Sequence, residues 1–262
     1  MILRDETLRA GGQSVHLLRG GSGAPLLVLH GWGSTGERYR NAFTHIPDAA
    51  VSVVIPDLPG FGATSAPPAA WGVEEYAFWV RELLSALRWS SCVVLGHSFG
   101  GRIAIMLAAT APQKLRGLIL YGAAGVTPPN RMKLTVFRTL AKMGGALFRL
   151  PWLRKIAPFA QKVLYRLAGT RDYPHAGNLQ PVFRKVVVQD LLPLLRAIAV
   201  PTGILWGRND RETPVADAET LQREISHSHL RILDGVGHAI HRENPRLFAE
   251  ELLSLLRRFP AP

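Results

Sequence analysis

The sequence predicts an α/β fold in which a mostly parallel sheet is flanked by helices. Short apolar runs recur at residues 25–30, 51–56, 92–95, 115–121 and 201–206, and stretches with helical spacing of apolar residues separate them. The runs are apolar throughout, as expected for parallel strands that helices cover on both faces. Glycine-rich loops follow several of the runs. Such loops lie at the carboxyl ends of the strands, where α/β sheets bind their ligands.

The remaining core elements alternate along the chain in the same way. Residues 1–20 alternate apolar and polar side chains, which predicts one or two edge strands. The pattern further predicts helices over residues 34–46 and 74–87, and a third from the serine motif described below to about residue 109. A fourth helix follows the loop that ends at residue 214 and runs to residue 225. The last strand is predicted over 229–233, and a closing amphipathic helix over 245–259.

Strand signals disappear between residues 126 and 190. Amphipathic, basic segments interrupted by proline and glycine predict a helical cap (lid) here, inserted after the sixth core strand, with 1–125 and 191–262 as the core. This stretch holds twelve Lys and Arg against Asp172 and Asp190, and so carries most of the formal net charge of +12. We expect the apolar faces of the cap to line a hydrophobic pocket.

The basic charge raises the question of an anionic partner. No zinc-finger spacing, aromatic RNA-binding signature or phosphate-binding loop accompanies it, so we predict no nucleic-acid partner. The simplest interpretation is that the basic helix faces are solvated. Peripheral contact with an anionic membrane surface through the basic cap is one alternative, and an anionic substrate is another.

Cysteine usage and the first residues of the chain predict a cytoplasmic protein. Cys92 is the single cysteine and opens an apolar strand, so we expect a buried structural thiol and no internal disulfide. Residues 1–13 lack the apolar segment of a signal peptide. No run approaches the roughly 18 apolar residues that a membrane-spanning helix requires.

Ser98 is the candidate nucleophile. It lies in a Gly-His-Ser-Phe-Gly pattern at residues 96–100, between an apolar strand and a helix-like run. The glycines permit a sharp strand-to-helix turn that exposes a serine hydroxyl at the carboxyl end of the sheet. The loop at residues 30–33, His-Gly-Trp-Gly, follows another strand. Such a loop supplies half of the oxyanion hole in a serine hydrolase, or is otherwise a plain βα turn.

A serine nucleophile needs a base, and histidine is the usual one near neutral pH. His238 lies in a glycine-flanked loop just after the last predicted strand and is the best candidate of the nine histidines. His97 adjoins Ser98, but adjacent side chains on a tight turn point apart, so we reject it as the base. His30 is expected to shape its loop, and His241 lies in the helix after His238.

A carboxylate must orient the base and stabilise its imidazolium form. Asp210 follows a strand one βα unit before His238, in the chain order Ser, Asp, His. Glu212 is an alternative two residues further on. Asp57 precedes the nucleophile strand, and Asp234 is only four residues from His238, so both are less suitable. This chemistry predicts no metal and no organic cofactor.

These motifs, in this order, resemble the α/β-hydrolase fold family over essentially the whole chain. The resemblance implies a Ser98–His238–Asp210 catalytic triad. It also implies an oxyanion hole formed by the backbone N–H groups of Trp32 and Phe99. The pieces that carry the resemblance are residues 30–33, 57–62, 96–101, 207–210 and 237–238.

The residue at position 98 narrows the branch of this family. Branches that cleave carbon–halogen bonds or epoxides use aspartate there, so Ser98 argues against both. The branch that cleaves carbon–carbon bonds in ring-fission products has a similar acid loop, but it tends to carry Gly-Asn-Ser at the turn and Gly-Pro-Gly in the oxyanion loop. This chain has Gly-His-Ser and Gly-Trp-Gly instead.

We therefore predict a serine esterase that cleaves a small to medium, largely apolar ester through an acyl-enzyme. Two other chemistries are alternatives: carbon–carbon hydrolysis of vinylogous diketones, and cofactor-free reactions like those of haloperoxidases or perhydrolases. A ligand-binding protein without catalysis is a third alternative, because a fold does not fix a function.

Overall fold

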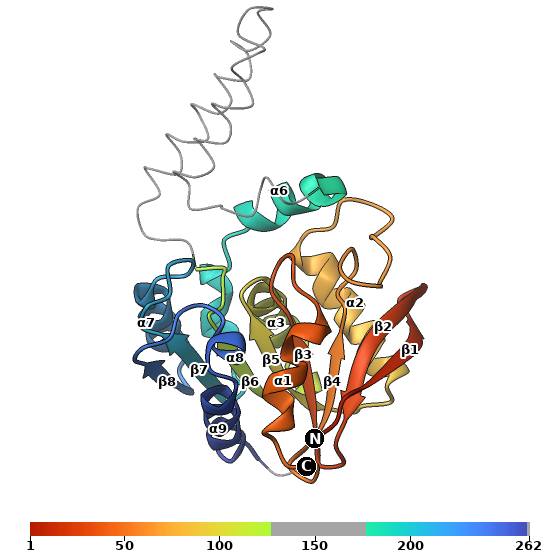
Figure 1. Ribbon diagram of the computed structural model, residues 1–262. Coiled ribbons are helices and arrows are strands. Elements are labelled where there is room, and N and C mark those ends of the chain that lie inside the picture. The colour runs from red at the N-terminus through yellow and green to blue at the C-terminus, as the bar shows by residue number, and fades with distance from the viewer. Residues whose placement is uncertain (127–176, 261–262) are drawn as a thin grey trace, which may run out of the picture.

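The computed structural model describes residues 1–126 and 177–260 (Figure 1). Residues 127–176, most of the predicted cap, lie outside this range, so the inserted basic helices stay a prediction. Of the predicted cap, only Val126 and residues 177–190 are described. No helix of the described residues is long and apolar enough to cross a membrane.

Eight strands form a single sheet in the order β1-β2-β4-β3-β5-β6-β7-β8. The pairs β1–β2 and β2–β4 are antiparallel, and all the later pairs are parallel, which confirms the predicted mostly parallel sheet. From β1 to β8 the strands span Arg4–Ala10, Gln13–Gly20, Ala24–Leu29, Val51–Pro56, Cys92–His97, Leu115–Tyr121, Thr202–Gly207 and Ser228–Leu233.

Helices connect the parallel strands (Figure 1). The α-helices are α1 (Arg40–Thr44), α2 (Val73–Ala86), α3 (Phe99–Thr110), α6 (Gln180–Val188), α7 (Val215–Glu224), α8 (Ile240–Glu243) and α9 (Pro245–Leu256). The 3₁₀ helices are η1 (Gly36–Tyr39), η2 (Pro112–Lys114), η4 (Gly177–Leu179) and η5 (Leu192–Ala197).

The helix predicted over residues 34–46 is present over residues 36–44, as the 3₁₀ helix η1 followed directly by the short helix α1. At its start, the backbone N–H of Gly36 donates to the buried Asp57 carboxylate at 2.9 Å. This contact fixes the start of η1 against the loop that follows β4.

Side chains that alternate along the central strands divide the core into two layers. Leu27 and Leu29 of β3 pack with α2, α3 and α7 on one face of the sheet. Leu26 and Val28 of the same strand pack with α1, α8 and α9 on the other face. A strand that is buried on both faces must be apolar throughout, which is why these segments show no polar alternation. Cys92 in β5 is buried, as predicted.

Helix α3 approaches the centre of the sheet at two glycines. A β-carbon added to Gly100 would lie 2.1 Å from the carbonyl oxygen of Leu29, and one added to Gly96 would lie 2.5 Å from the carbonyl oxygen of Gly100. Both distances are far below van der Waals contact, and the atoms that would be struck belong to the backbone. Only glycine therefore permits the observed distance between α3 and the strands β3 and β5.

Because of this contact, we expect Gly100→Ala to lower the free energy of unfolding by about 3 kcal/mol or more. The matched control is Gly203→Ala in β7, where the new methyl group would meet only the end of the Leu255 side chain, at 3.0 Å. A leucine side chain can move, so we expect a loss of about 1 kcal/mol there. Urea unfolding of both variants measures the difference, and equal losses would contradict this account of the helix position.

Candidate active site

Ser98 lies in a strained turn between β5 and α3. Its backbone has φ 52° and ψ −111°, a conformation that costs a residue with a side chain roughly 1–3 kcal/mol. Hydrogen bonds hold it there: its N–H donates to the Tyr121 carbonyl at 3.1 Å, and its own carbonyl accepts from Gly101 at 3.0 Å and Ala124 at 3.1 Å. The neighbouring strand β6 and the segment after it thus fix the predicted nucleophile.

The predicted base and acid meet after β8 and β7. His238 Nδ1 lies 2.7 Å from Asp210 Oδ2, and the aspartate side chain is fully buried. The pair packs on Gly122, where an added β-carbon would lie 3.2 Å from His238 Nδ1 and 3.4 Å from Asp210 Oδ2. Gly122 directly follows Tyr121, which accepts the Ser98 N–H. The structure therefore brings the pair to the same end of β6 as the predicted nucleophile.

Asp210 is held by its own loop. Its Oδ1 accepts backbone N–H groups from Glu212 at 2.8 Å and Thr213 at 2.9 Å, and the Thr213 hydroxyl donates to Oδ2 at 2.8 Å. Burial by itself would raise the pKa of Asp210, but the hydrogen bond with His238 and the loop N–H groups outweigh it, so the pKa lies below its ordinary value. Sequence reasoning missed Thr213, because no pattern marks a threonine three residues after an acid.

Glu212, the alternative acid, contacts the other nitrogen of the same imidazole. Its Oε2 lies 3.4 Å from His238 Nε2, and its side chain is half exposed. Asp210 and Glu212 therefore approach His238 from opposite sides. Nε2 is the nitrogen left to exchange a proton once Nδ1 is bound to Asp210.

The other two carboxylates considered for this role serve elsewhere. Asp57 is buried and accepts the backbone N–H groups of Gly36 at 2.9 Å and Ala63 at 3.0 Å, which fastens the loops after β3 and β4. Asp234 is exposed and pairs with Arg208. Within residues 1–126 and 177–260, no group of three or more His, Cys, Asp or Glu side chains could hold a metal ion.

The predicted oxyanion donors lie beside the turn. A β-carbon on Gly31 would be 3.3 Å from the β-carbon of Ser98, so the loop after β3 packs directly on the nucleophile turn. Among the described residues, no acceptor takes a hydrogen bond from the backbone N–H of Trp32 or Phe99. Two unused N–H groups next to a serine are what an oxyanion hole requires.

His30 shapes the loop that carries these donors, as the sequence analysis expected. It is fully buried, its Nε2 accepts the Leu58 N–H at 3.0 Å, and its Nδ1 contacts the Gly31 carbonyl at 2.8 Å. Burial lowers the pKa of His30 to about 4, so the ring is neutral near pH 7. A neutral ring has one donor and one acceptor nitrogen, which is the pattern these two contacts need.

His97 braces the loop of the predicted base. Its Nε2 lies 3.0 Å from the backbone carbonyl of His238, and its ring stacks on Tyr121 with centroids 4.3 Å apart. Burial lowers the pKa of His97 well below its usual value, so the neutral ring donates its Nε2–H to that carbonyl. Sequence reasoning only removed His97 as a base. This bracing contact joins residues 141 positions apart, and no local signal reveals it.

An aromatic cluster, defined here as Trp32, Phe61, Phe99 and Phe183, covers the oxyanion loop. The Trp32 ring centroid lies 5.0 Å from that of Phe61, 5.3 Å from that of Phe99 and 4.9 Å from that of Phe183, all in edge-to-face geometry. Phe183 belongs to α6, within the predicted cap. The described end of that cap thus contributes an apolar side chain next to the predicted oxyanion donors.

Comparison with known proteins gives one family. A family model described as "Alpha/beta hydrolase family" matches residues 26–251. An uncharacterized protein of Mycobacterium tuberculosis is 30% identical, with 88% of this chain and 74% of that protein covered. The 2-hydroxy-6-oxo-2,4-heptadienoate hydrolase of Pseudomonas putida is 28% identical, with 91% of each chain covered.

Two further proteins are similar over nearly the same length. The pimeloyl-[acyl-carrier protein] methyl ester esterase of Aeromonas hydrophila is 27% identical, with 90% of this chain and 97% of that protein covered. Among solved structures, an esterase from Exiguobacterium antarcticum matches with a TM-score of 0.75 at 22% identity, with 97% of this chain and 100% of that chain covered. The structural likeness concerns the fold.

The charged form of Asp217, near the start of α7, is disfavoured by burial and by the nearby charge of Asp210. Burial raises the pKa of Asp217 to about 6, the charge of Asp210 raises it further, and Arg102 opposes the rise. Asp217 therefore loses its proton at about pH 4 in the unfolded chain and only at about pH 6 in the folded protein. Between these pH values the folded protein binds a proton that the unfolded chain does not. Stability associated with this proton is present at low pH and is lost as the pH rises through that range.

Asp217→Asn should therefore raise the free energy of unfolding by about 1–2 kcal/mol at pH 8 and change it little at pH 4. Urea unfolding at the two pH values measures the difference. Glu219→Gln, on the exposed side of the same helix, is the matched control and should show no such dependence. A gain of equal size at both pH values would mean that the charge of Asp217 is not its source.

Proposed function

Because this chain belongs to the alpha/beta hydrolase family, we propose that it is a serine hydrolase that cleaves a carboxylic ester. The observation that carries the proposal is the contact of 2.7 Å between His238 and the fully buried Asp210 side chain, packed on the strand end that also holds the strained Ser98. An aspartate on Nδ1 orients the imidazole so that Nε2 can accept a proton from a serine.

The proposed reaction proceeds in two halves. Ser98 Oγ attacks the ester carbonyl while His238 Nε2 takes its proton, and the Trp32 and Phe99 N–H groups donate to the oxyanion. The imidazolium then protonates the departing alcohol, which leaves an acyl group on Ser98. Water, deprotonated by His238, attacks this acyl-enzyme and releases the acid. Asp210 keeps its charge throughout and stabilises the imidazolium.

The proposed substrate is a small to medium, largely apolar ester. The aromatic cluster supports this, because it brings apolar rings from four separate segments together at the predicted oxyanion donors. The name of the Aeromonas relative, a methyl ester esterase, is also in accord with ester cleavage. Burial of an apolar group of the substrate against these rings would stabilise its binding by roughly 25 cal/mol per Å².

A second chemistry is favoured by a specific comparison. The Pseudomonas putida relative bears the name of a hydrolase of 2-hydroxy-6-oxo-2,4-heptadienoate, a dienoate that carries both an enol and a ketone. Hydrolysis of a carbon–carbon bond in a compound of this kind would use the same serine, histidine and aspartate. The two chemistries therefore differ in the substrate that the site accepts, and a substrate panel separates them.

Turnover of p-nitrophenyl esters from acetate to laurate tests the proposal. We expect the wild type to hydrolyse them and Ser98→Ala to lose at least about a thousandfold in kcat/KM. Ser85→Ala, in an exposed turn of α2, is the control and should keep full activity. The chain-length optimum reports the length of the apolar subsite.

A folded wild type that is inert on the whole ester series, yet cleaves a vinylogous diketone in a Ser98-dependent way, would establish the carbon–carbon chemistry instead. Activity on either substrate class that survives Ser98→Ala would overturn the assignment of the nucleophile. Circular dichroism of each variant shows whether a loss of turnover reflects chemistry or unfolding.

The contact between Glu212 and His238 predicts an effect of Glu212 on the pH dependence of kcat/KM. A carboxylate 3.4 Å from His238 Nε2 stabilises the protonated imidazole, which is inactive as a base. Glu212→Gln should therefore move the acid limb of the kcat/KM profile to lower pH, and the displacement should be small because the Glu212 side chain is half exposed. Glu219→Gln is the control. A shift to higher pH would contradict this account of Glu212.

A further inference from the structure

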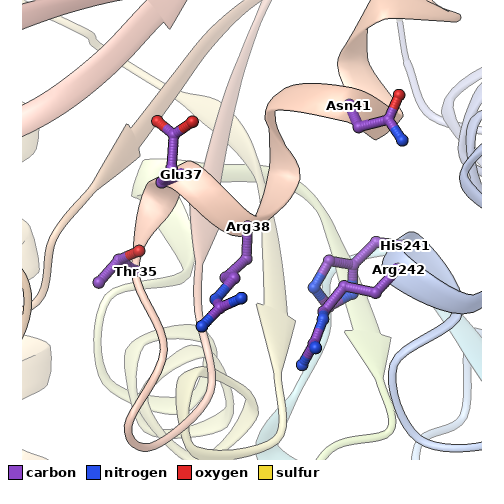
Figure 2. Close-up of a pocket in the computed structure, with 6 residues that line it drawn as sticks. All are labelled: Thr35, Glu37, Arg38, Asn41, His241 and Arg242. Atoms are coloured by element: carbon purple, nitrogen blue, oxygen red, sulfur yellow. The ribbon is translucent and has the colours of Figure 1, made fainter.

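A pocket lies beside the loop of His238, between the segment after β3 and helix α8. Its volume is about 460 Å³, and it is lined by Thr35, Glu37, Arg38, Asn41, His241 and Arg242. Figure 2 shows the side chains of Arg38 and Arg242 extending in the same direction, with the imidazole of His241 beside them. The proposed ester hydrolysis uses none of these side chains.

The pocket holds cations that have no anion. Among the described residues, the side chain of neither Arg38 nor Arg242 has a hydrogen-bond or ion-pair partner, and both side chains are exposed. The one carboxylate of the lining, Glu37, accepts from Arg40 Nε at 2.9 Å and 3.0 Å, so its charge is already matched. The lining itself carries a formal net charge of about one positive unit, and Arg40, which lies outside the lining, offsets the negative charge of Glu37.

A third donor of the pocket is buried. His241 is 2% exposed, and the Tyr121 hydroxyl accepts the His241 backbone N–H at 3.1 Å and lies 3.0 Å from Nδ1. Among the described residues, His241 Nδ1 is the one acceptor within hydrogen-bond distance of that hydroxyl. The hydroxyl proton therefore goes to Nδ1, and the proton of the neutral ring lies on Nε2. This buried Nε2 has no partner. A buried N–H without an acceptor destabilises the folded protein. Its position in a cationic pocket therefore indicates that a bound anion would supply the missing acceptor.

The ring of His241 is in place to be such a donor. It stacks on Tyr39 with centroids 4.1 Å apart and an interplanar angle of 5°, which fixes its orientation. Burial, and then the charges of Arg242, His238 and Arg38, lower the pKa of His241 to about 3. The imidazole is therefore neutral under ordinary conditions and offers a hydrogen bond without adding charge.

We propose that this pocket binds a phosphate-type oxyanion, either free or carried by a substrate, with Arg38, Arg242 and His241 Nε2 as its donors. Two guanidinium groups match a doubly negative phosphate in charge and in geometry, since each presents paired N–H groups to paired oxygens. The Thr35 hydroxyl and the Asn41 amide, which also line the pocket, add neutral donors.

Binding here would act on the loop of the predicted base. Helix α8 begins two residues after His238, and Glu243 at its end accepts the backbone N–H groups of Gly237 at 2.6 Å and Ala239 at 3.0 Å. Arg242 and His241 belong to the same helix. An oxyanion held by them stabilises the helix that fixes both neighbours of His238. This coupling rests on the proposed function, whereas binding of the anion does not.

Binding is tested without turnover. Sodium phosphate is titrated into the wild type, Arg38→Gln/Arg242→Gln and Arg4→Gln/Arg9→Gln, and sodium chloride of equal ionic strength is the reference. Isothermal titration calorimetry measures Kd, and thermal unfolding measures Tm. The control pair lies on the exposed edge strand β1 and removes the same charge.

We expect phosphate at ten times its Kd to raise Tm by about 3 °C over chloride in the wild type and the control. The pocket variant should lose at least about tenfold in affinity. Equal effects of phosphate and chloride, undiminished binding by the pocket variant, or an equal loss in the control variant would each overturn the site.

Kinetics then identify the source of the oxyanion, with two esters that share one acyl group and differ in whether the alcohol carries a phosphate. If the pocket takes the phosphate of the substrate, inorganic phosphate competes with the phosphorylated ester alone, and the pocket variant raises the KM of that ester about tenfold. If the ligand is free phosphate, it binds without competing with either ester. Both patterns support the site. Because the titration needs no substrate, a failure of ester hydrolysis leaves that test intact.

Discussion

The close approach of α3 to the sheet is the constraint on which the rest of the structure depends. The missing side chains at Gly96 and Gly100 let the helix begin directly against β5 and β3. The turn between strand and helix must then be made by one residue, and Ser98 takes the strained conformation that this requires. The same approach lets the Gly100 N–H donate to the His30 carbonyl at 3.1 Å, which joins the start of α3 to the end of β3.

Adjacent strands carry the remaining parts of the site to that point. β7 and β8 pair in parallel, so the loops after them leave the sheet side by side and bring Asp210 and His238 together. β6 separates them from β5 and ends in Tyr121 and Gly122, of which one accepts the Ser98 N–H and the other leaves room for the pair. The site is thus a property of the strand order, and each loop contributes one or two groups.

The sequence predicted the strands of the sheet and the loops at their carboxyl ends that carry the candidate site residues. Apolar runs identified the strands to within a residue or two, since strands buried on both faces have no other composition. The glycines around Ser98 and His238 marked loops that end strands. The family and its α/β-hydrolase fold are confirmed by the family match and the sheet order.

Other features depend on contacts that no local pattern encodes. Thr213 holds Asp210 only because their loop turns back on itself, and His97 meets the His238 carbonyl only through the pairing of distant strands. The helix predicted over residues 34–46 is present as η1 and α1, but the contact that fixes its start, from the Gly36 N–H to the buried Asp57 carboxylate, joins residues 21 positions apart. In each of these cases a tertiary contact decides the local outcome.

The pairing of charges in the fold is another feature that local sequence does not encode, and it determines the candidate anion site. Counted along the chain, the basic excess falls in residues 126–190, outside the segment that contains Glu37, Arg38 and Arg40. In the folded protein, the Glu37 carboxylate pairs with Arg40, and the Arg38 side chain lines the same pocket as Arg242, which lies about two hundred residues later in the chain. The charge that matters in this pocket is the part left unpaired after folding. Charge counts along a sequence therefore locate basic segments, whereas a candidate anion site is found by asking which donors the fold leaves without acceptors.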